Sequence, residues 1–126
     1  MRRMLWWLTL LAIPMILCNC GGPQACTLVG AVSGVQVTGG GAGAALQICA
    51  GSSCGTAKLV GGSVFVPLSA LRPGRAVDLE VTVTVASRRV VSHANVVPVK
   101  SAPNGPGCAP TVALAELRLD QAGRAQ

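Results

Sequence analysis

Aromatic residues are scarce in this sequence, which has two Trp, one Phe and no Tyr among 126 residues. Both Trp residues stand in an N-terminal apolar run, so Phe65 is the one aromatic residue of the remainder. The core must then be built from Val, Leu, Ile and Ala, each of which buries less area than an aromatic ring. We expect no nucleic-acid binding, because no aromatic residues interleave with the scattered basic ones to stack on bases.

Catalytic side chains are also few, since the chain has four Asp and Glu residues and one His. A histidine acting as base needs a nucleophile and an orienting acid beside it. His93 lies in a strand-like segment, where Ser92 faces the opposite side. Asp78 and Glu80 share a strand face about 7 Å apart, a separation found in glycosidases, but no aromatic platform for a sugar accompanies them. We therefore expect His93 to face solvent or to be a hydrogen-bonded strand histidine, and we predict that the protein is not an enzyme.

Metal and cofactor motifs are missing too. The sequence has no C-x-x-C pair and a single histidine, which argues against zinc ligation. The glycine run over 39–43 lacks the Gly-Lys-Ser/Thr that completes a phosphate-binding loop. We predict no metal and no cofactor, and interpret this run as a flexible turn between strands.

The N-terminus has the proportions of a signal peptide. Arg2 and Arg3 precede an uncharged apolar run over 5–17, which is shorter than the ~20 residues of a membrane-spanning helix. We predict a helical signal peptide over 1–20 and a linker over 21–25. The alternative is an uncleaved anchor whose helix continues through Cys18 and Cys20.

A degraded lipobox ends this leader. The motif requires an aliphatic residue three positions before the cysteine and a small residue directly before it. Cys20 has Leu17 at the first position and Asn19 at the second, whereas Cys18 and Cys26 fit less well. Cys20 is therefore the best candidate for lipid attachment, which would make the membrane a partner. Ordinary signal-peptidase cleavage between Cys20 and Cys26 is the alternative.

Beyond the leader the sequence is typical of β-structure. The clearest strand is 77–86, where apolar residues at odd positions alternate with Asp78, Glu80, Thr82 and Thr84. Further strands are predicted over 26–38 with a bend or bulge at Gly34, and over 45–49, 55–60, 63–68, 90–100 and 111–120.

About seven short strands in one domain predict an immunoglobulin-like antiparallel β-sandwich over 26–120. A small closed barrel is the alternative. The last strand, 111–120, is rich in helix-forming residues, but the preceding strands need a closing partner. Residues 121–126 are predicted to form a disordered tail.

Four cysteines in a small exported domain predict two disulfides. Cys49 and Cys54 lie on the two arms of a predicted hairpin, which leaves Cys26 with Cys108. In such a sandwich the first and last strands lie side by side and parallel, and both remaining cysteines precede their strands. A redox or metal site is the competing interpretation.

Basic residues exceed acidic ones by about four after the leader. This excess favours loose attraction to anionic envelope polymers or lipid headgroups. Arg72 and Arg75 lie in a Pro-Gly turn, and Arg88 and Arg89 are expected at a hairpin tip. These four arginines are candidate contacts for a partner, or else form solvated turns.

Three segments carry a resemblance to a known group of proteins: CTLVGAVSGVQV, LQICAGSSC and PNGPGCAPTVALAELRL. Together they resemble small uncharacterised secreted proteins and lipoproteins of high-GC actinobacteria, over roughly residues 26 to 119. The resemblance implies a small disulfide-containing β-sandwich outside the cytoplasm, and it brings no catalytic residues.

We therefore expect a non-catalytic accessory or interaction module of the cell envelope, held at the outer face of the cytoplasmic membrane by lipid on Cys20. A freely secreted binding domain and a signal-anchored membrane protein are the alternatives.

Overall fold

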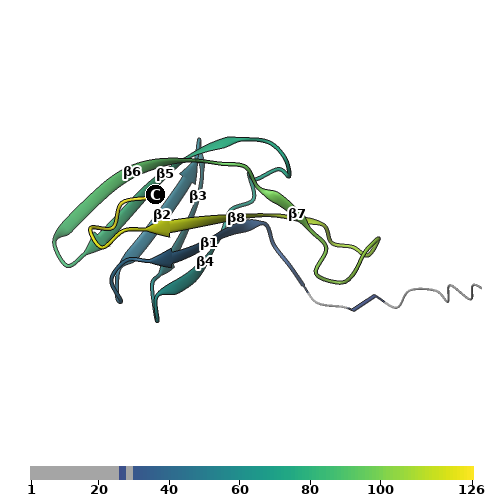
Figure 1. The fold of residues 1–126 in the computed structure, drawn as a ribbon, viewed down its shortest axis with the longest axis horizontal. Coiled ribbons are helices and arrows are strands. Elements are labelled where there is room, and N and C mark those ends of the chain that lie inside the picture. Colours follow the sequence, from purple (N-terminus) through teal and green to yellow (C-terminus); the bar gives the residue numbers. More distant parts are fainter. Residues whose placement is uncertain (1–25, 28–29) are drawn as a thin grey trace, which may run out of the picture.

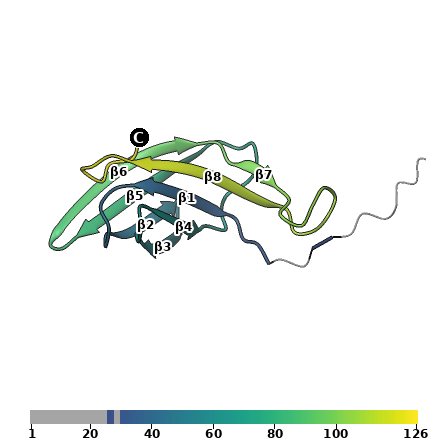
Figure 2. The same cartoon turned by 60° about the horizontal axis from the view of Figure 1, so that its bottom comes forward.

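Two sheets packed face to face make up the described part of the protein (Figures 1 and 2). The structure is a computed structural model, and it describes residues 26–27 and 30–126. The predicted signal peptide, the linker and Cys20 lie outside these residues. No helix long and apolar enough to cross a membrane occurs within the described residues.

The described residues form eight strands, four in each sheet. This confirms an all-β sandwich, and the sheets do not close into a barrel. Sheet A has the spatial order β4 (Ser63–Pro67), β1 (Gly34–Gly39), β8 (Val112–Leu119), β7 (Val99–Ser101). Sheet B has the order β3 (Ser53–Lys58), β2 (Ala45–Ala50), β5 (Val77–Val85), β6 (Arg88–Val96).

The first and last strands are neighbours and run parallel, as predicted. Strand β1 pairs with β8 from Gly34 opposite Leu114 to Gly39 opposite Leu119. The segment rich in helix formers is thus a strand, because in this position Leu117 and Leu119 become buried. The parallel pairing also brings the starts of both strands to one end of the molecule.

One aliphatic core fills the space between the sheets. It contains no aromatic ring, in agreement with the composition. Its buried members are Val35, Val37, Ala44, Leu46, Ile48, Leu59, Val66, Leu68, Leu71, Leu79, Val81, Val83, Ala113, Ala115, Leu117 and Leu119.

The prediction for the first strand was wrong at its start. Strand β1 begins at Gly34 rather than at residue 26, and Gly34 pairs with Pro67 on one side and Leu114 on the other. A Cβ at this position would overlap the ring of Phe65. Gly34 is thus a site of close approach within a paired strand, and not a bulge.

The predicted strand over 90–100 divides in two. Strand β6 ends at Val96 in sheet B, and β7 begins at Val99 in sheet A. Between them Pro98 is fully buried, and proline cannot donate a main-chain hydrogen bond to continue a ladder. The chain therefore changes sheets here, which raises the strand count above the predicted seven.

The hairpin between β5 and β6 turns earlier than predicted. Val85 pairs with Arg88, so Ala86 and Ser87 form the turn and the two arginines begin β6.

Burial along β5 also departs from strict alternation. Val85 is 45% exposed near the hairpin tip, whereas Thr82 is only 6% exposed between its neighbours in the middle of sheet B.

The last six residues fold back instead of forming a disordered tail. Leu119 and Ala125 form a β-bridge, and the Gln126 amide donates to the Arg118 carbonyl at 2.8 Å. The Ala125 amide donates to Ser92 Oγ at 2.9 Å. The tail is therefore fixed between β8 and β6.

Replacing Ala86 with Gly is expected to stabilise the protein by up to about 1 kcal/mol. Ala86 has φ 52°, a left-handed conformation that costs a non-glycine residue about 1–2 kcal/mol. The greater freedom of glycine in the unfolded chain offsets about 0.4–1 kcal/mol of this gain. Thermal unfolding should show a rise of a few degrees. Ser87→Gly, at the next turn position, is the control and should lower the melting temperature or leave it unchanged.

Candidate functional site

Both predicted disulfides are present in the described residues. Cys49 and Cys54 face each other across the β2–β3 hairpin, with their Cα atoms 4.1 Å apart. Cys26 is bonded to Cys108, with a Cα–Cα distance of 5.7 Å. Intramolecular disulfides persist in oxidising compartments, so the pair is consistent with an extracytoplasmic location.

Polar contacts reinforce the chain where residue 26 joins the sandwich. Thr27 Oγ1 donates to Asn104 Oδ1 at 3.0 Å, and Asn104 Nδ2 donates to the Ala109 carbonyl at 2.8 Å. The Asn104 side chain is 4% exposed. The segment before β1 is thereby tied to the loop before β8, at the end of the molecule opposite the β5–β6 hairpin tip (Figure 1).

The four candidate arginines divide into two separate pairs. Arg72 and Arg75 precede β5, whereas Arg88 and Arg89 follow it. The nine residues of β5 span about 30 Å, so the pairs do not form one binding surface. Arg72 also donates to the carbonyls of Ser69 and Leu71, at 2.8 and 3.0 Å.

His93 and the carboxylates lie on the exposed outer face of sheet B. His93 pairs with Glu80, and Asp78 Oδ1 accepts a hydrogen bond of 2.7 Å from Asn95 Nδ2. Ser92 faces the opposite side, towards the C-terminal tail, as predicted. Within the described ranges no group of three His, Cys, Asp or Glu residues could hold a metal ion.

The four sheet edges in the described residues differ in how well they are protected. Strand β7 has three residues, and β4 has five and ends with Pro67. Strand β3 packs against β4, so that a Cβ on Gly55 would overlap the Pro67 carbonyl oxygen. Strand β6 has nine residues and no proline. Natural edge strands are usually short, charged or interrupted. Strand β6 is the longest of the four and is charged only at its start, by Arg88 and Arg89, so it is the least protected of these edges.

The main-chain groups of β6 can be assigned from its register. A two-residue turn makes Val85 and Arg88 a hydrogen-bonded pair, and such pairs alternate along an antiparallel ladder. Val90, Ser92, Ala94 and Val96 therefore bond to β5. The N–H and C=O groups of the intervening residues, Arg89, Val91, His93 and Asn95, point to the free edge. No main-chain hydrogen bond from the rest of the described chain reaches them.

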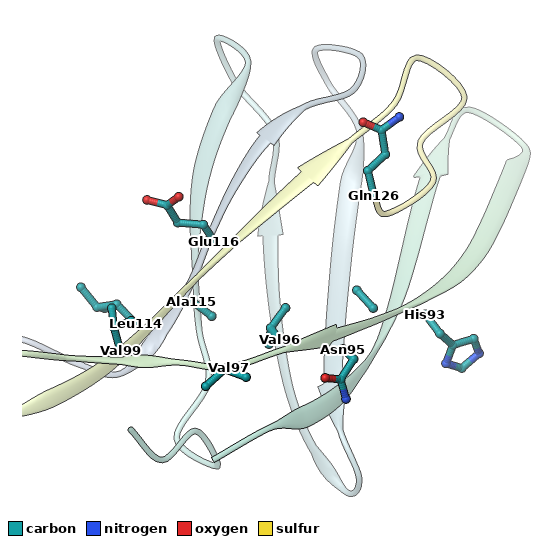
Figure 3. A pocket seen from close by; sticks show the side chains of 10 residues that line it. His93, Asn95, Val96, Val97, Val99, Leu114, Ala115, Glu116 and Gln126 are labelled. Carbon is teal, nitrogen blue, oxygen red and sulfur yellow. The ribbon is translucent and has the colours of Figure 1, made fainter. Parts of the chain in front are cut away.

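An open groove of about 600 Å³ runs beside the end of this edge (Figure 3). It lies between the last residues of β6 and the middle of β8, with Val99 and Leu114 toward one end and His93 and Gln126 toward the other. Val97 and Val99 are 56% and 64% exposed. The groove exists because the chain changes sheets at Pro98, a change that no local sequence pattern indicates. We define the β6 edge and this groove together as the β6 site.

No family model, curated protein or solved structure matches this chain. Its function must therefore be argued from the β6 site and from the predicted leader.

Proposed function

We propose that this protein is an exported, non-catalytic interaction module of the cell envelope, which binds a protein partner at the β6 site. The observation that carries the proposal is the nine-residue edge of β6. Four alternate residues along it point their N–H and C=O groups outward, and no main-chain hydrogen bond from the described residues reaches these groups. Such an edge binds an extended peptide segment by adding a strand to the sheet. The exposed valines beside it supply apolar contacts for the side chains of that segment.

Export and membrane attachment are part of the proposal. The predicted signal peptide, the two disulfides and the resemblance to actinobacterial secreted proteins and lipoproteins all support export. We further propose that Cys20 carries a lipid. Six residues of chain reach at most about 20 Å, so this tether would hold the disulfide-bonded end of the sandwich close to the membrane. The β6 site then lies along the side of the domain, accessible to other envelope proteins.

A freely secreted binding domain is the alternative, because the β6 site can bind a partner without a lipid anchor. The mass of the intact protein from its native host, before and after reduction and alkylation, distinguishes the two. A chain that starts at Cys20 with an added lipid supports the tether. An unlipidated start after Cys20 supports secretion, and retention of Met1 supports an uncleaved anchor. Free thiols at the four bridged cysteines would contradict export.

The β6 site itself is tested with a photoreactive amino acid at position 91 in the host cell. Val91 is 49% exposed at the middle of the edge. The control position is Thr56, which is exposed on the same sheet face but lies on the opposite edge strand, β3. We expect a discrete cross-linked product from position 91 and none from position 56. Equal products, or none at either position, would contradict the proposed function.

A further inference from the structure

We infer that the partner at the β6 site is a second copy of this chain, with the two β6 strands paired antiparallel about a two-fold axis at Ser92. The inference rests on the proposed function, because it names the occupant of the same edge. It makes one continuous eight-stranded sheet from the two copies of sheet B. The contact is isologous, as in most homodimers.

The register follows from which residues face the free edge. An axis at Ser92 places Arg89 opposite Asn95 of the second copy, and Val91 opposite its His93. All four are positions whose N–H and C=O groups point outward, so every pair can exchange main-chain hydrogen bonds. All nine residues of β6 then overlap. Moving the axis to Val91 or His93 still places outward-facing residues opposite one another, but it leaves two residues of each β6 strand unpaired.

The charges on the outer face of sheet B are complementary in this register. Asp78 accepts a hydrogen bond from Asn95, which lies beside it on β6. Arg89 of the second copy would lie on the other side of Asn95, within side-chain reach of the Asp78 carboxylate. The two Arg89 residues are six positions apart along the pair, which is about 20 Å. That distance exceeds the screening length of ~8–10 Å in physiological salt, so their repulsion is weak.

The proposed dimer also covers two exposed valines at this edge, Val91 and Val97. Val91, 49% exposed, would pack beside the imidazole of His93 of the second copy. Val97, 56% exposed, lies one residue beyond β6, where the pairing would bring the hairpin turn of the second copy. That turn would cover one end of the groove. An unrelated extended peptide could supply the main-chain hydrogen bonds, but nothing in the structure specifies its charges, whereas a second copy provides the matching ones.

The decisive experiment uses Ser92→Cys in the full chain, exported and purified from its host. On the axis, the two Ser92 residues form a non-hydrogen-bonded pair, in which side chains are closest, although the substitution also removes the hydrogen bond from the Ala125 amide to Ser92 Oγ. The native Cys49–Cys54 disulfide occupies a pair of the same kind, with 4.1 Å between Cα atoms. We expect a reducible dimer of twice the chain mass. Ala94→Cys is the control: it also faces inward, but its two copies would be about 14 Å apart, too far for a disulfide.

A second experiment avoids new thiols. Light scattering should give the mass of a dimer for the unaltered chain, and Arg89→Glu should raise the dissociation constant at least about tenfold. Asp78→Arg in the same chain should restore the dimer, because the opposed charges are then exchanged. A monomer at all concentrations, together with no bridge at position 92, overturns the inference.

The photoreactive residue at position 91 distinguishes a failure of the dimer from a failure of the proposed function. A product with twice the mass of the chain supports the second copy. A product containing a different protein, from a monomeric chain, refutes the dimer and leaves the proposed function standing. No product from position 91 refutes both.

Discussion

The double variant Cys26→Ser, Cys108→Ser is expected to lose about 4.5 kcal/mol of unfolding free energy, because this disulfide closes a loop spanning 82 residues. Domains of this size have a net stability of only ~5–15 kcal/mol. The aliphatic core has no aromatic ring to add burial. We therefore expect the variant to be marginally folded or unfolded at 37 °C. Urea unfolding followed by far-UV circular dichroism measures the loss.

The matched control is Cys49→Ser, Cys54→Ser, which opens a loop spanning five residues. The same chain-entropy relation gives a loss of about 2 kcal/mol there. The ratio between the two losses is the test, since both variants replace a cystine by two serines. Equal losses, or a larger loss for the short loop, would show that native-state contacts, rather than loop closure, determine the contribution of each bridge.

The position of the long bridge gives it a second role in a tethered protein. It joins the segment at residue 26 to the loop before β8, beside the hydrogen bonds of Thr27 and Asn104. If the protein is tethered as proposed, a force transmitted from the membrane would reach this bridge before it reaches β1. Because β1 lies between β4 and β8, peeling it away would open sheet A at its centre. In a tethered protein the bridge would therefore protect the sheet at the point where the chain enters.

Local sequence patterns were sufficient to predict much of the fold. Alternation of apolar and polar residues identified β5, and the cysteine positions identified both disulfides. The parallel pairing of the first and last strands followed from the expected sandwich topology. These features depend on periodicity or on covalent constraints, which leave a direct signal in the sequence.

The features that the sequence did not reveal depend on contacts between distant residues. Nothing local shows that Pro98 becomes buried while the chain crosses from sheet B to sheet A. The turn at Ala86 was misplaced because it lacks the usual Gly or Asn for a left-handed residue. The C-terminal tail is held by Ser92, 33 residues earlier in the chain.

The β6 site was missed for a related reason. Whether a strand is central or at an edge depends on the order of strands in the sheet, and the pattern of a single strand does not determine that order. The alternation in β6 was recognised, and of the two alternatives for His93 the structure shows the solvent-facing one. Its free main-chain groups became evident only when β5 was found on one side and no strand of the described chain on the other.

Gly55→Ala is expected to destabilise the protein by about 3 kcal/mol, the upper part of the usual range for overpacking. A methyl group at this position would overlap the carbonyl oxygen of Pro67 and lie 2.9 Å from Cγ1 of Val66. Neither neighbour can yield easily, because the first is main chain and the second belongs to a fully buried core residue. Strands β3 and β4 would have to separate, which would open the side of the sandwich opposite β6.

The sign of this effect is informative, because replacing Gly by Ala in an unobstructed strand stabilises it by roughly 0.5–1 kcal/mol. Gly41→Ala is the control: a Cβ there meets nothing within 4 Å, and we expect a change within about 0.5 kcal/mol. Urea unfolding of both variants makes the comparison. A stable Gly55→Ala protein would mean that β3 and β4 do not touch. Strand β3 would then be a second accessible edge, and β6 would no longer be distinguished from it as the docking site.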